Sequence, residues 1–371
     1  MAKINLKVSE LRKQKQIGQQ ELAEVLGVTY QSVSKWETGV TMPDITLLPA
    51  IAEYFNVTVD ELLGLKPLRE QRYIRRNTDD RSNWNEKTDK LFQNRRNFWN
   101  DDYLRFLVEQ VWHITAPVRV LDFWCGDGYL GRKLLEVLPE GSSYTGVDNA
   151  YFTKKAEELF LETEITAEFM VSDLYSFRTD KKYDLAVCQG CLRHVNRPLE
   201  VLAKMTDAVK KGGLVIGVEV NREFENDGIY IDGMDYEALC TNFDYHPLWR
   251  TELEKEGRDY AIGMRLPFYM HQLGLHDIDV RMNDKVLFTY PRRADFNKQL
   301  QEFIQVNGWD RMSGIAENEG LINRFMNRGI SRGDAEKFVL MQAKIANHFA
   351  QADTEKAFLK VQGLMIAYGI K

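Results

Sequence analysis

Cysteine, proline and long apolar runs are scarce in this chain of 371 residues. It has nine prolines and four cysteines, Cys125, Cys188, Cys191 and Cys240. So few cysteines cannot form the dense disulfide framework of a small secreted domain. No stretch approaches the roughly 18 uninterrupted apolar residues that a transmembrane helix needs, and the opening MAKINLKVSELRKQK lacks the apolar core of a signal peptide. We therefore expect a soluble cytoplasmic protein without a membrane partner.

A strong excess of positive charge is also absent. The formal net charge is −6, and 28% charged with 44% hydrophobic residues is typical of globular proteins. Residues 1–96 hold 16 basic against 13 acidic side chains, a net charge of only +3. A prediction of nucleic-acid binding therefore needs a motif, because net charge does not supply the argument.

The segment 6–65 predicts a compact, all-helical unit of short amphipathic helices. In its centre, QQELAEVLGVTYQSVSKWETG, Gly27 suits a left-handed turn and Thr29 is a natural N-cap for the helix that follows. The residues expected to face inward are Leu22, Val28, Val33 and Trp36.

This stretch, with Trp36-Glu37-Thr38-Gly39 after the second helix, resembles the Cro/phage-repressor (XRE-type) helix-turn-helix family. The resemblance implies that residues 1–66 bind duplex DNA as a homodimer, because one recognition helix reads only a half-site. Glutamine can read adenine and lysine can reach phosphates. The candidate DNA-binding residues are Gln19, Gln31, Ser32, Ser34 and Lys35. The alternative is a helical bundle used only for dimerisation. Residues 67–96, polar and rich in arginine, predict a linker or a solvated helix.

From residue 97 the pattern changes to alternating helices and apolar strands. Strands are predicted at 118–123, 143–148, 167–171, 183–189 and 212–220, with helical stretches between them. The first strand ends near Asp122, and a glycine-containing turn and a helix follow, which is the geometry of a nucleotide-type site. Asp148 closes the second strand twenty residues past Gly128, where a carboxylate can accept both ribose hydroxyls. The fold class is therefore α/β with a Rossmann-like sheet.

The ordered set Asp122, Gly126, Gly128, Asp148, Asp173, then YDLAV and VKKGGLVIG, resembles the class I S-adenosylmethionine-dependent methyltransferases over residues 97 to about 292. The resemblance implies S-adenosylmethionine as cofactor, with the two glycines against its methionine part, Asp148 at its ribose and Asp173 with Leu174 at its adenine. Gln189 would lie near the sulfonium and Tyr103 over the cofactor carboxylate. The candidate cofactor-binding residues are Tyr103, Asp122, Trp124, Gly126, Gly128, Asp148, Asn149, Asp173, Leu174 and Gln189. A dehydrogenase is a minor alternative, because Gly131 nearly completes a dinucleotide fingerprint.

Trp124 departs from the family, which usually has its first loop glycine at this position. An indole here walls the methionine pocket, stacks near the sulfonium or blocks the cofactor. His194 is the candidate general base and Glu219 a second catalytic candidate; a packed histidine and a hydrogen-bonding glutamate are the alternatives. Cys188 and Cys191 resemble half of a metal motif, but no second pair lies at zinc spacing, and we predict no metal.

The chain after residue 276 predicts two short strands, 277–282 and 285–291, joined as a hairpin through Asn283-Asp284. Residues 293–371 are expected to form a helical lid, with Ser331 as a cap. The segment QGCLRHV after the fourth strand lacks the proline-containing motifs of DNA methyltransferases. We therefore expect a methyltransferase that acts on a small molecule and is fused to a DNA-binding regulator domain. The alternative is a transcriptional regulator whose methyltransferase-like domain only senses the cofactor or a metabolite.

Overall fold

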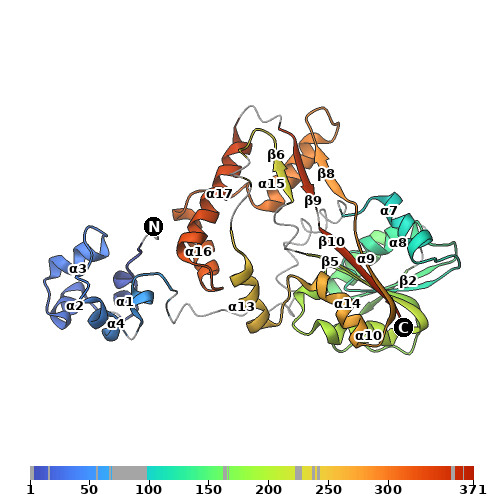
Figure 1. Cartoon of the computed structure of the whole chain (residues 1–371), viewed down its shortest axis with the longest axis horizontal. Helices are drawn as coiled ribbons and strands as arrows, with labels where there is room; N and C mark the ends of the chain where they lie inside the picture. Colours follow the sequence, from blue (N-terminus) through green and yellow to red (C-terminus); the bar gives the residue numbers. More distant parts are fainter. Residues whose placement is uncertain are drawn as a thin grey trace. The chain divides into compact units, whose positions relative to one another are not determined.

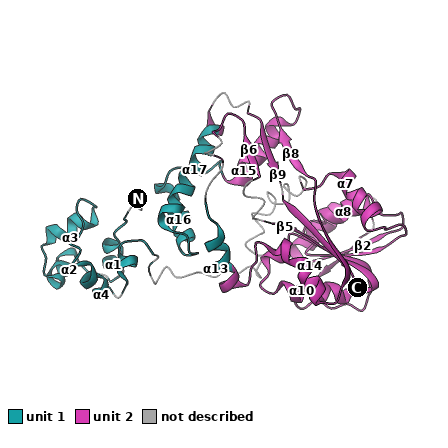
Figure 2. Cartoon of the chain, in the orientation of Figure 1, with its two compact units in different colours: residues 1–76, 241–252, 309–348 teal, residues 77–240, 253–308, 349–371 magenta. Residues whose placement is uncertain are grey.

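A computed structural model describes most of the chain (Figure 1). The described residues are 4–15, 17–55, 57–66, 68, 98–161, 165, 167–221, 228–235, 239, 243–351, 356–361 and 363–371. Apart from Leu68, the predicted linker 67–96 lies outside them. The chain forms two compact units that alternate along the sequence (Figure 2). Unit 1 contains residues 1–76, 241–252 and 309–348, and unit 2 contains residues 77–240, 253–308 and 349–371.

The N-terminal region is all-helical, as predicted. Its helices are α1 (Val8–Gln14), α2 (Gln19–Leu26), α3 (Tyr30–Glu37), α4 (Leu48–Tyr54) and α5 (Val59–Leu62). Each helix contributes one residue with no exposed surface to a shared core, namely Val8, Leu22, Val33, Ile51 and Leu62. Gly27 ends α2 with a φ of +67°, and the Thr29 side chain accepts the Ser32 N–H to cap α3. Both local predictions for the turn are confirmed.

The other helices of unit 1 are mainly C-terminal in sequence. They are the first part of α13 (His246–Glu256), η5 (Ala316–Asn318), α16 (Glu319–Met326) and most of α17 (Arg332–Ala350). The Ser331 hydroxyl accepts the Asp334 N–H at 3.1 Å, which confirms Ser331 as the cap of α17. Phe243, Phe325 and Phe338 pack with ring centroids 4.8 to 5.4 Å apart and form the aromatic core of this group.

Unit 2 is built on a seven-stranded sheet with the order β3-β2-β1-β4-β5-β10-β7. Its strands are β1 (Arg119–Phe123), β2 (Ser143–Asp148), β3 (Ala167–Val171), β4 (Tyr183–Gln189), β5 (Val209–Val220), β7 (His276–Met282) and β10 (Leu364–Ile370). Strands β1 to β5 are parallel, and β10 is antiparallel to both β5 and β7. Only β10 therefore runs against the others in this sheet. The five strands predicted from the sequence are confirmed, and their carboxyl ends meet at one edge.

Helices cover both faces of this sheet and bury two apolar layers. One layer includes side chains of α7 (Asp101–Phe106), η3 (Leu107–Val111), α8 (Tyr129–Leu135) and α9 (Ala150–Leu161). The other includes side chains of η4 (Leu192–His194), α10 (Pro198–Ala208) and α14 (Ile262–Gln272). Because β1 and β4 are buried along most of their length, most of their side chains are apolar.

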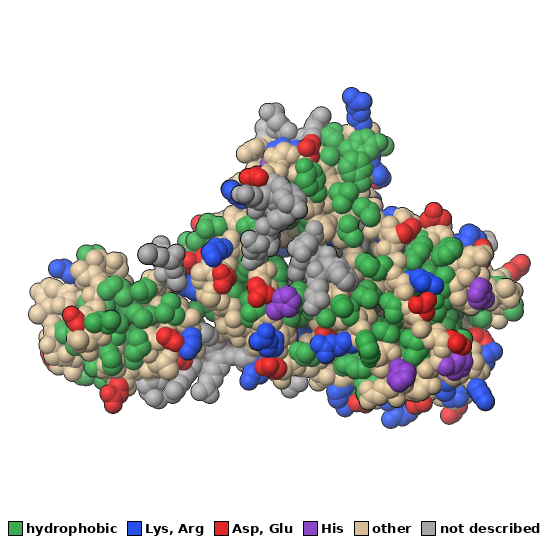
Figure 3. All heavy atoms as spheres, viewed as in Figure 1, with side chains coloured by type: hydrophobic (Ala, Val, Ile, Leu, Met, Phe, Trp, Pro, Cys, Tyr) green, Lys and Arg blue, Asp and Glu red, His purple; other side chains and the backbone are tan. Residues whose placement is uncertain are grey.

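The predicted hairpin through Asn283-Asp284 is wrong. Strand β7 lies in the large sheet, whereas β8 (Val286–Thr289) pairs with β9 (Phe358–Val361) in a separate sheet of order β6-β9-β8. Strand β6 (Ile229–Ile231) completes this small sheet, against which α15 (Phe296–Asn307) places Phe303, 3.9 Å from the Phe358 ring centroid. Hydrophobic side chains gather over the small sheet in the view of Figure 3.

The C-terminal stretch is helical only in part. Helices α15, α16 and α17 agree with the prediction for residues 293–371, but the last elements are the strands β9 and β10. The residues expected to form one lid are also divided between the two units. None of the described helices is long and apolar enough to cross a bilayer.

Candidate functional site

The loop that follows β1 has three residues in the left-handed backbone region. Their φ angles are +62° at Trp124, +61° at Gly126 and +73° at Gly128, which begins α8 as its N-cap. Glycine adopts this conformation at little cost, whereas a tryptophan is strained there. Trp124 therefore keeps the backbone shape of the glycine that the family resemblance implies at this position.

Asp148, at the end of β2, holds this loop in place. Its side chain is 1% exposed. One carboxylate oxygen accepts the N–H of Gly126 at 3.0 Å and the other accepts the N–H of Asn149 at 2.7 Å. Charge-assisted bonds of this kind are stronger than neutral ones, so the carboxylate fixes the loop between β1 and α8.

Asp122 also lies at the carboxyl end of β1, but its carboxylate accepts the Tyr144 hydroxyl at 2.8 Å. Burial and this carboxylate raise the pKa of Tyr144 well above its usual value, so the phenol stays a donor. The Tyr144 ring also explains Gly131, where an added Cβ would lie 2.1 Å from a ring carbon. The glycine that suggested a dinucleotide fingerprint is required for packing between α8 and β2.

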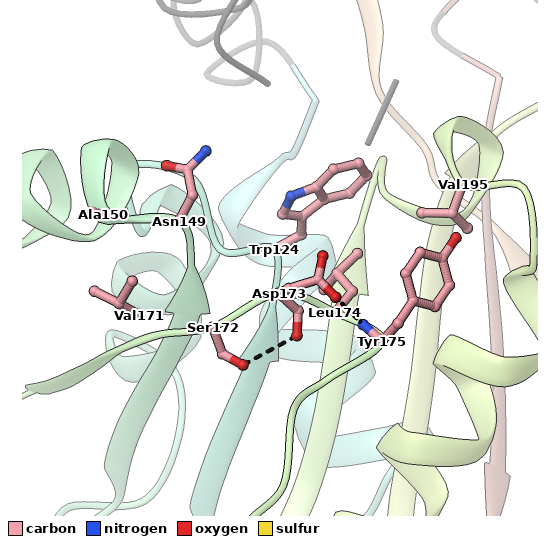
Figure 4. Close-up of a pocket in the computed structure, with 9 residues that line it drawn as sticks. All are labelled: Trp124, Asn149, Ala150, Val171, Ser172, Asp173, Leu174, Tyr175 and Val195. Carbon is pink, nitrogen blue, oxygen red and sulfur yellow. Dashed lines mark hydrogen bonds between the residues drawn. The ribbon is translucent and has the colours of Figure 1, made fainter. Parts of the chain in front are cut away.

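A pocket of about 390 Å³ opens at the carboxyl edge of the sheet (Figure 4). It follows the ends of β1, β2, β3 and β4, where open parallel sheets commonly bind ligands. Its lining residues are Trp124, Asn149, Ala150, Val171, Ser172, Asp173, Leu174, Tyr175 and Val195. Four of the candidate cofactor residues are among them, namely Trp124, Asn149, Asp173 and Leu174. The remaining lining residues were not predicted, because their apolar or neutral side chains belong to no motif.

The polar residues of the pocket are ordered by their own loops. The Asp173 carboxylate accepts the N–H groups of Tyr175 and Ser176 at 2.9 and 3.1 Å. The side-chain oxygen of Asn149 accepts the Phe152 N–H at 3.0 Å, at the start of α9. The Tyr175 hydroxyl donates to Asn196 at 2.6 Å. These bonds orient the lining side chains.

Six candidate cofactor residues lie outside the pocket lining, among them Tyr103 and Gln189. The Tyr103 hydroxyl donates to the Met282 carbonyl at the end of β7, at 2.8 Å. The Gln189 side-chain oxygen accepts the Trp99 indole N–H at 3.1 Å. The Gln189 amide nitrogen is buried and finds no hydrogen-bond partner among the described residues. A buried donor without a partner is costly, which makes Gln189 a position where a ligand atom would be stabilised.

The Glu219 carboxyl lies at the end of β5 and has no exposed surface. One oxygen accepts the N–H groups of Cys191 and Leu192 at 2.8 and 2.6 Å. The other is buried and has no partner among the described residues. Burial raises its pKa to about 7, although Arg193 and the backbone N–H groups act in the opposite direction. Glu219 therefore orders the start of η4, the short helix that ends at His194.

His194 lies beside Trp124, the residue of the glycine loop that departs from the family pattern. Its ring centroid is 6.4 Å from that of Trp124, in an edge-to-face arrangement. Its Nε2 accepts the Arg193 Nε–H at 3.1 Å. The structure thus brings Trp124, His194 and the loop held by Glu219 together. In the described part of the chain no group of three or more His, Cys, Asp or Glu side chains is arranged to hold a metal ion, and the described cysteines are free thiols.

The candidate DNA-binding residues differ in their exposure and in their hydrogen bonds. Gln31 and Lys35 are exposed on α3, whereas Ser32 and Ser34 are half-buried. The Gln19 amide donates to Glu37 at 2.7 Å, and the Arg12 guanidinium donates to both oxygens of the same carboxylate. Gln19 is therefore bound within the domain. Sequence reasoning missed Arg12, because its partner lies 25 residues away.

Comparison with known proteins matches two parts of the chain to two families. Residues 8–62 match the family described as helix-turn-helix. Residues 71–278, more than half of the chain, match the family described as a methyltransferase domain.

Three relatives match one domain or the other. The HTH-type transcriptional activator BcrR of Enterococcus faecalis is 43% identical over 60 residues, which are 16% of this chain and 29% of that protein. The ubiquinone biosynthesis O-methyltransferase of Hydrogenovibrio crunogenus is 27% identical over 110 residues, 29% of this chain and 44% of the relative. The tRNA U34 carboxymethyltransferase of Nautilia profundicola is 32% identical over 138 residues, 35% of this chain and 42% of the relative. The chain spans less than half the length of each of these relatives.

Proposed function

We propose that this chain, which belongs to the methyltransferase-domain family and carries a helix-turn-helix domain, transfers a methyl group from S-adenosylmethionine to a small molecule. The observation that carries the proposal is the pocket at the carboxyl ends of β1 to β4, lined by Asn149, Asp173 and Trp124. Its volume of about 390 Å³ lies within the range of roughly 300 to 1,000 Å³ that is usual for small-molecule sites.

The residues at this edge fit the cofactor. Of the lining residues, Asn149 would hold the ribose hydroxyls, and Asp173 would accept from the adenine amino group while Leu174 packs against the base. The carboxylate of Asp148, which is buried and outside the lining, would take part in ribose binding at the end of β2. The buried amide nitrogen of Gln189, which has no partner among the described residues, supplies a further donor at the end of β4. When bound, S-adenosylmethionine supplies a methyl group on a positively charged sulfur, and the chain's own task is to align an acceptor with it.

A base is needed only if the acceptor carries a proton that must leave. His194 lies next to the pocket residue Trp124, and its neutral imidazole would remove the proton of a hydroxyl once Nε2 exchanges the Arg193 N–H for that hydroxyl. Glu219 would act indirectly, by ordering the segment that carries His194. For a thiolate or free amine, alignment alone would suffice.

A small-molecule acceptor is favoured by the segment after β4. Its sequence, QGCLRHV, has neither proline-containing motif of DNA methyltransferases. The names of the relatives differ in the acceptor. One is a ubiquinone biosynthesis O-methyltransferase and another is a tRNA U34 carboxymethyltransferase.

The helix-turn-helix domain would bind duplex DNA as a homodimer. Gln31 and Lys35 are exposed on α3, the helix that follows the turn, and are available to base edges and phosphates. Two recognition helices of a dimer would read two half-sites. The chain would thereby combine a methyltransferase with a transcriptional regulator.

A second candidate function is favoured by Trp124. A tryptophan with a left-handed backbone in the pocket lining is compatible with a site that binds the cofactor or a metabolite without turnover, and so acts as a sensor for the DNA-binding domain. Isothermal titration of the full chain with S-adenosylmethionine tests what both candidates share. Absence of binding at millimolar concentration would contradict both candidates. If the cofactor binds, a measurement of turnover separates them.

A further inference from the structure

Trp124 has a backbone conformation that its side chain disfavours. With a φ of +62° it lies in the left-handed region, where the Cβ crowds the following carbonyl oxygen. The backbone N–H of Trp124 donates to the Val147 carbonyl of β2 at 2.8 Å, and the N–H of Cys125 donates to the same oxygen at 3.2 Å. The neighbouring strand thus holds the strained residue in place. Strain of this kind persists where surrounding structure enforces it, and it concentrates at ligand sites.

The indole belongs to the pocket surface. Trp124 is 8% exposed and follows directly after β1, opposite the lining residues that follow β3. Figure 4 shows the indole projecting from the end of β1 into the space that the lining residues surround. Its edge-to-face contact with His194, with the ring planes at 70°, fixes its orientation on one side. A rigid aromatic wall therefore borders the place where the ligand would lie.

The charge of the pocket favours a cation. Asp173 is acidic, and none of the nine described lining residues is lysine, arginine or histidine. The pocket has a second aromatic ring, Tyr175, but the Arg197 guanidinium already lies 4.2 Å from the centroid of that ring. Of the aromatic side chains, an indole attracts a cation most strongly. An acidic group and an indole wall together prefer a positively charged ligand to a neutral one of similar shape.

We propose that Trp124 is a specificity-determining residue that makes this pocket prefer the sulfonium form of the cofactor to its neutral, demethylated form. The inference rests on the proposed function, because it takes S-adenosylmethionine as the ligand. Both forms share the adenosine and amino-acid parts, and they differ in one methyl group and one positive charge on sulfur. A cation within about 6 Å of the indole centroid is stabilised by an amount that corresponds to about 2- to 30-fold in affinity. Such a preference retains the charged cofactor and speeds release of the neutral product.

The test is a calorimetric titration of the full chain with S-adenosylmethionine and, separately, with S-adenosylhomocysteine. The variants are Trp124→Gly, Trp124→Phe and the matched control Trp112→Phe, which changes an indole of the same unit that does not line the pocket. Glycine suits a φ of +62°, so Trp124→Gly removes the indole without adding backbone strain. The quantity compared is the ratio of the two Kd values within each variant, because a partial loss of folded protein affects both ligands equally.

We expect the unaltered chain and Trp112→Phe to bind the sulfonium form about 2- to 30-fold more tightly. Trp124→Phe should keep part of this preference and Trp124→Gly should lose it. Equal affinities in the unaltered chain, or a preference that survives in Trp124→Gly, would overturn the role of Trp124 and leave cofactor binding intact. Binding of neither ligand would overturn the proposed cofactor, and this inference with it.

Discussion

The backbone N–H of Gly126 donates a hydrogen bond to the carboxylate of Asp148, with 3.0 Å between the nitrogen and Oδ2. Residues 22 positions apart thereby join the loop after β1 to the end of β2. The same carboxylate is the group expected to accept the ribose hydroxyls. One residue thus shapes the site and would also contact the ligand.

Replacement of this carboxylate should weaken cofactor binding. Asp148→Ala removes the predicted ribose contact and leaves the N–H groups of Gly126 and Asn149 without their acceptor. We expect a loss of about 1.5 to 3 kcal/mol, or roughly 10- to 150-fold in Kd, by titration calorimetry. Asp148→Asn keeps the size and one oxygen and should lose less. An unchanged Kd in Asp148→Ala would show that the ligand does not contact this residue.

Glu219 should make the stability of the chain depend on pH. Burial raises its pKa to about 7 in the folded state, whereas an unfolded glutamate titrates near 4.3. Between these values the folded state holds a proton that the unfolded state has released. The stabilisation is therefore fully present below about pH 4.3 and is lost as the pH rises to about 7, by on the order of 3 kcal/mol in total.

The matched variant for this effect is Glu219→Gln, which keeps an acceptor for the Cys191 and Leu192 N–H groups but does not titrate. Urea unfolding at pH values from 5 to 8 measures the free energy of unfolding for both proteins. As the pH rises, the free energy of unfolding of the unaltered chain should fall relative to that of Glu219→Gln. Two curves that stay parallel would contradict the raised pKa.

Arg12 should stabilise the helix-turn-helix domain through Glu37. The two side chains are 14% and 6% exposed, and the closest N–O distance is 2.6 Å. Burial alone would raise the pKa of Glu37, but hydrogen bonds from Arg12 and Gln19 outweigh it and lower the pKa. Arg12→Ala leaves a buried carboxylate and should destabilise the domain by on the order of 3 kcal/mol.

The control for this change is Lys13→Ala, on the same helix but exposed. Thermal unfolding of the full chain should show an earlier transition for Arg12→Ala and little change for the control. Equal transitions in both variants would mean that the ion pair contributes no net stability.

DNA binding should respond differently to two neighbouring changes on α3. Gln31→Ala should relax sequence preference, because it removes a base contact. Lys35→Ala should weaken binding to all sequences and reduce the slope of log K against log salt by about 1, because it removes a phosphate contact. Gel shifts with genomic fragments at several salt concentrations measure both effects. No retarded fragment at low salt would exclude DNA binding by the unaltered chain.

The effect of His194→Ala should identify the kind of acceptor. If the acceptor is a hydroxyl, turnover should fall by about 10² to 10⁴ while cofactor affinity stays nearly constant, since a general base acts in the transition state. If it is a thiolate or free amine, turnover should change little. A loss of cofactor affinity equal to the loss of turnover would instead assign His194 to binding.

Local signals predicted much of the fold. The strands β1 to β5 each carry apolar residues between turn signals, and Thr29 and Gly27 mark a helix start and a helix end through their own chemistry. The turn signal at Asn283-Asp284 gave a wrong hairpin, because a local signal does not show that another strand pairs with β7. Residue 282 pairs with residue 365 of β10, which takes the place of β8 beside β7. Short apolar runs such as LMIAYGI also do not distinguish strand from helix.

The positions of the candidate residues could be predicted where a motif fixes them. Asp148 ends β2, whereas Trp124 and Asp173 follow β1 and β3, so all three lie at the shared edge of the sheet. The partners that decide their chemistry come from distant segments, such as Trp99 for Gln189 and Cys191 for Glu219. Hydrogen bonds of this kind depend on the packed structure, so no spacing in the sequence indicates them.

Methyl transfer itself is the most direct test of the proposed function. The full chain should be incubated with methyl-labelled S-adenosylmethionine and an extract of small metabolites, and the products resolved by mass. We expect a labelled small-molecule product that forms with the unaltered chain and falls sharply with Asp148→Ala. If the cofactor binds tightly and changes the affinity of the chain for DNA, yet no labelled product forms, the chain is a sensor and the account of it as an enzyme is contradicted.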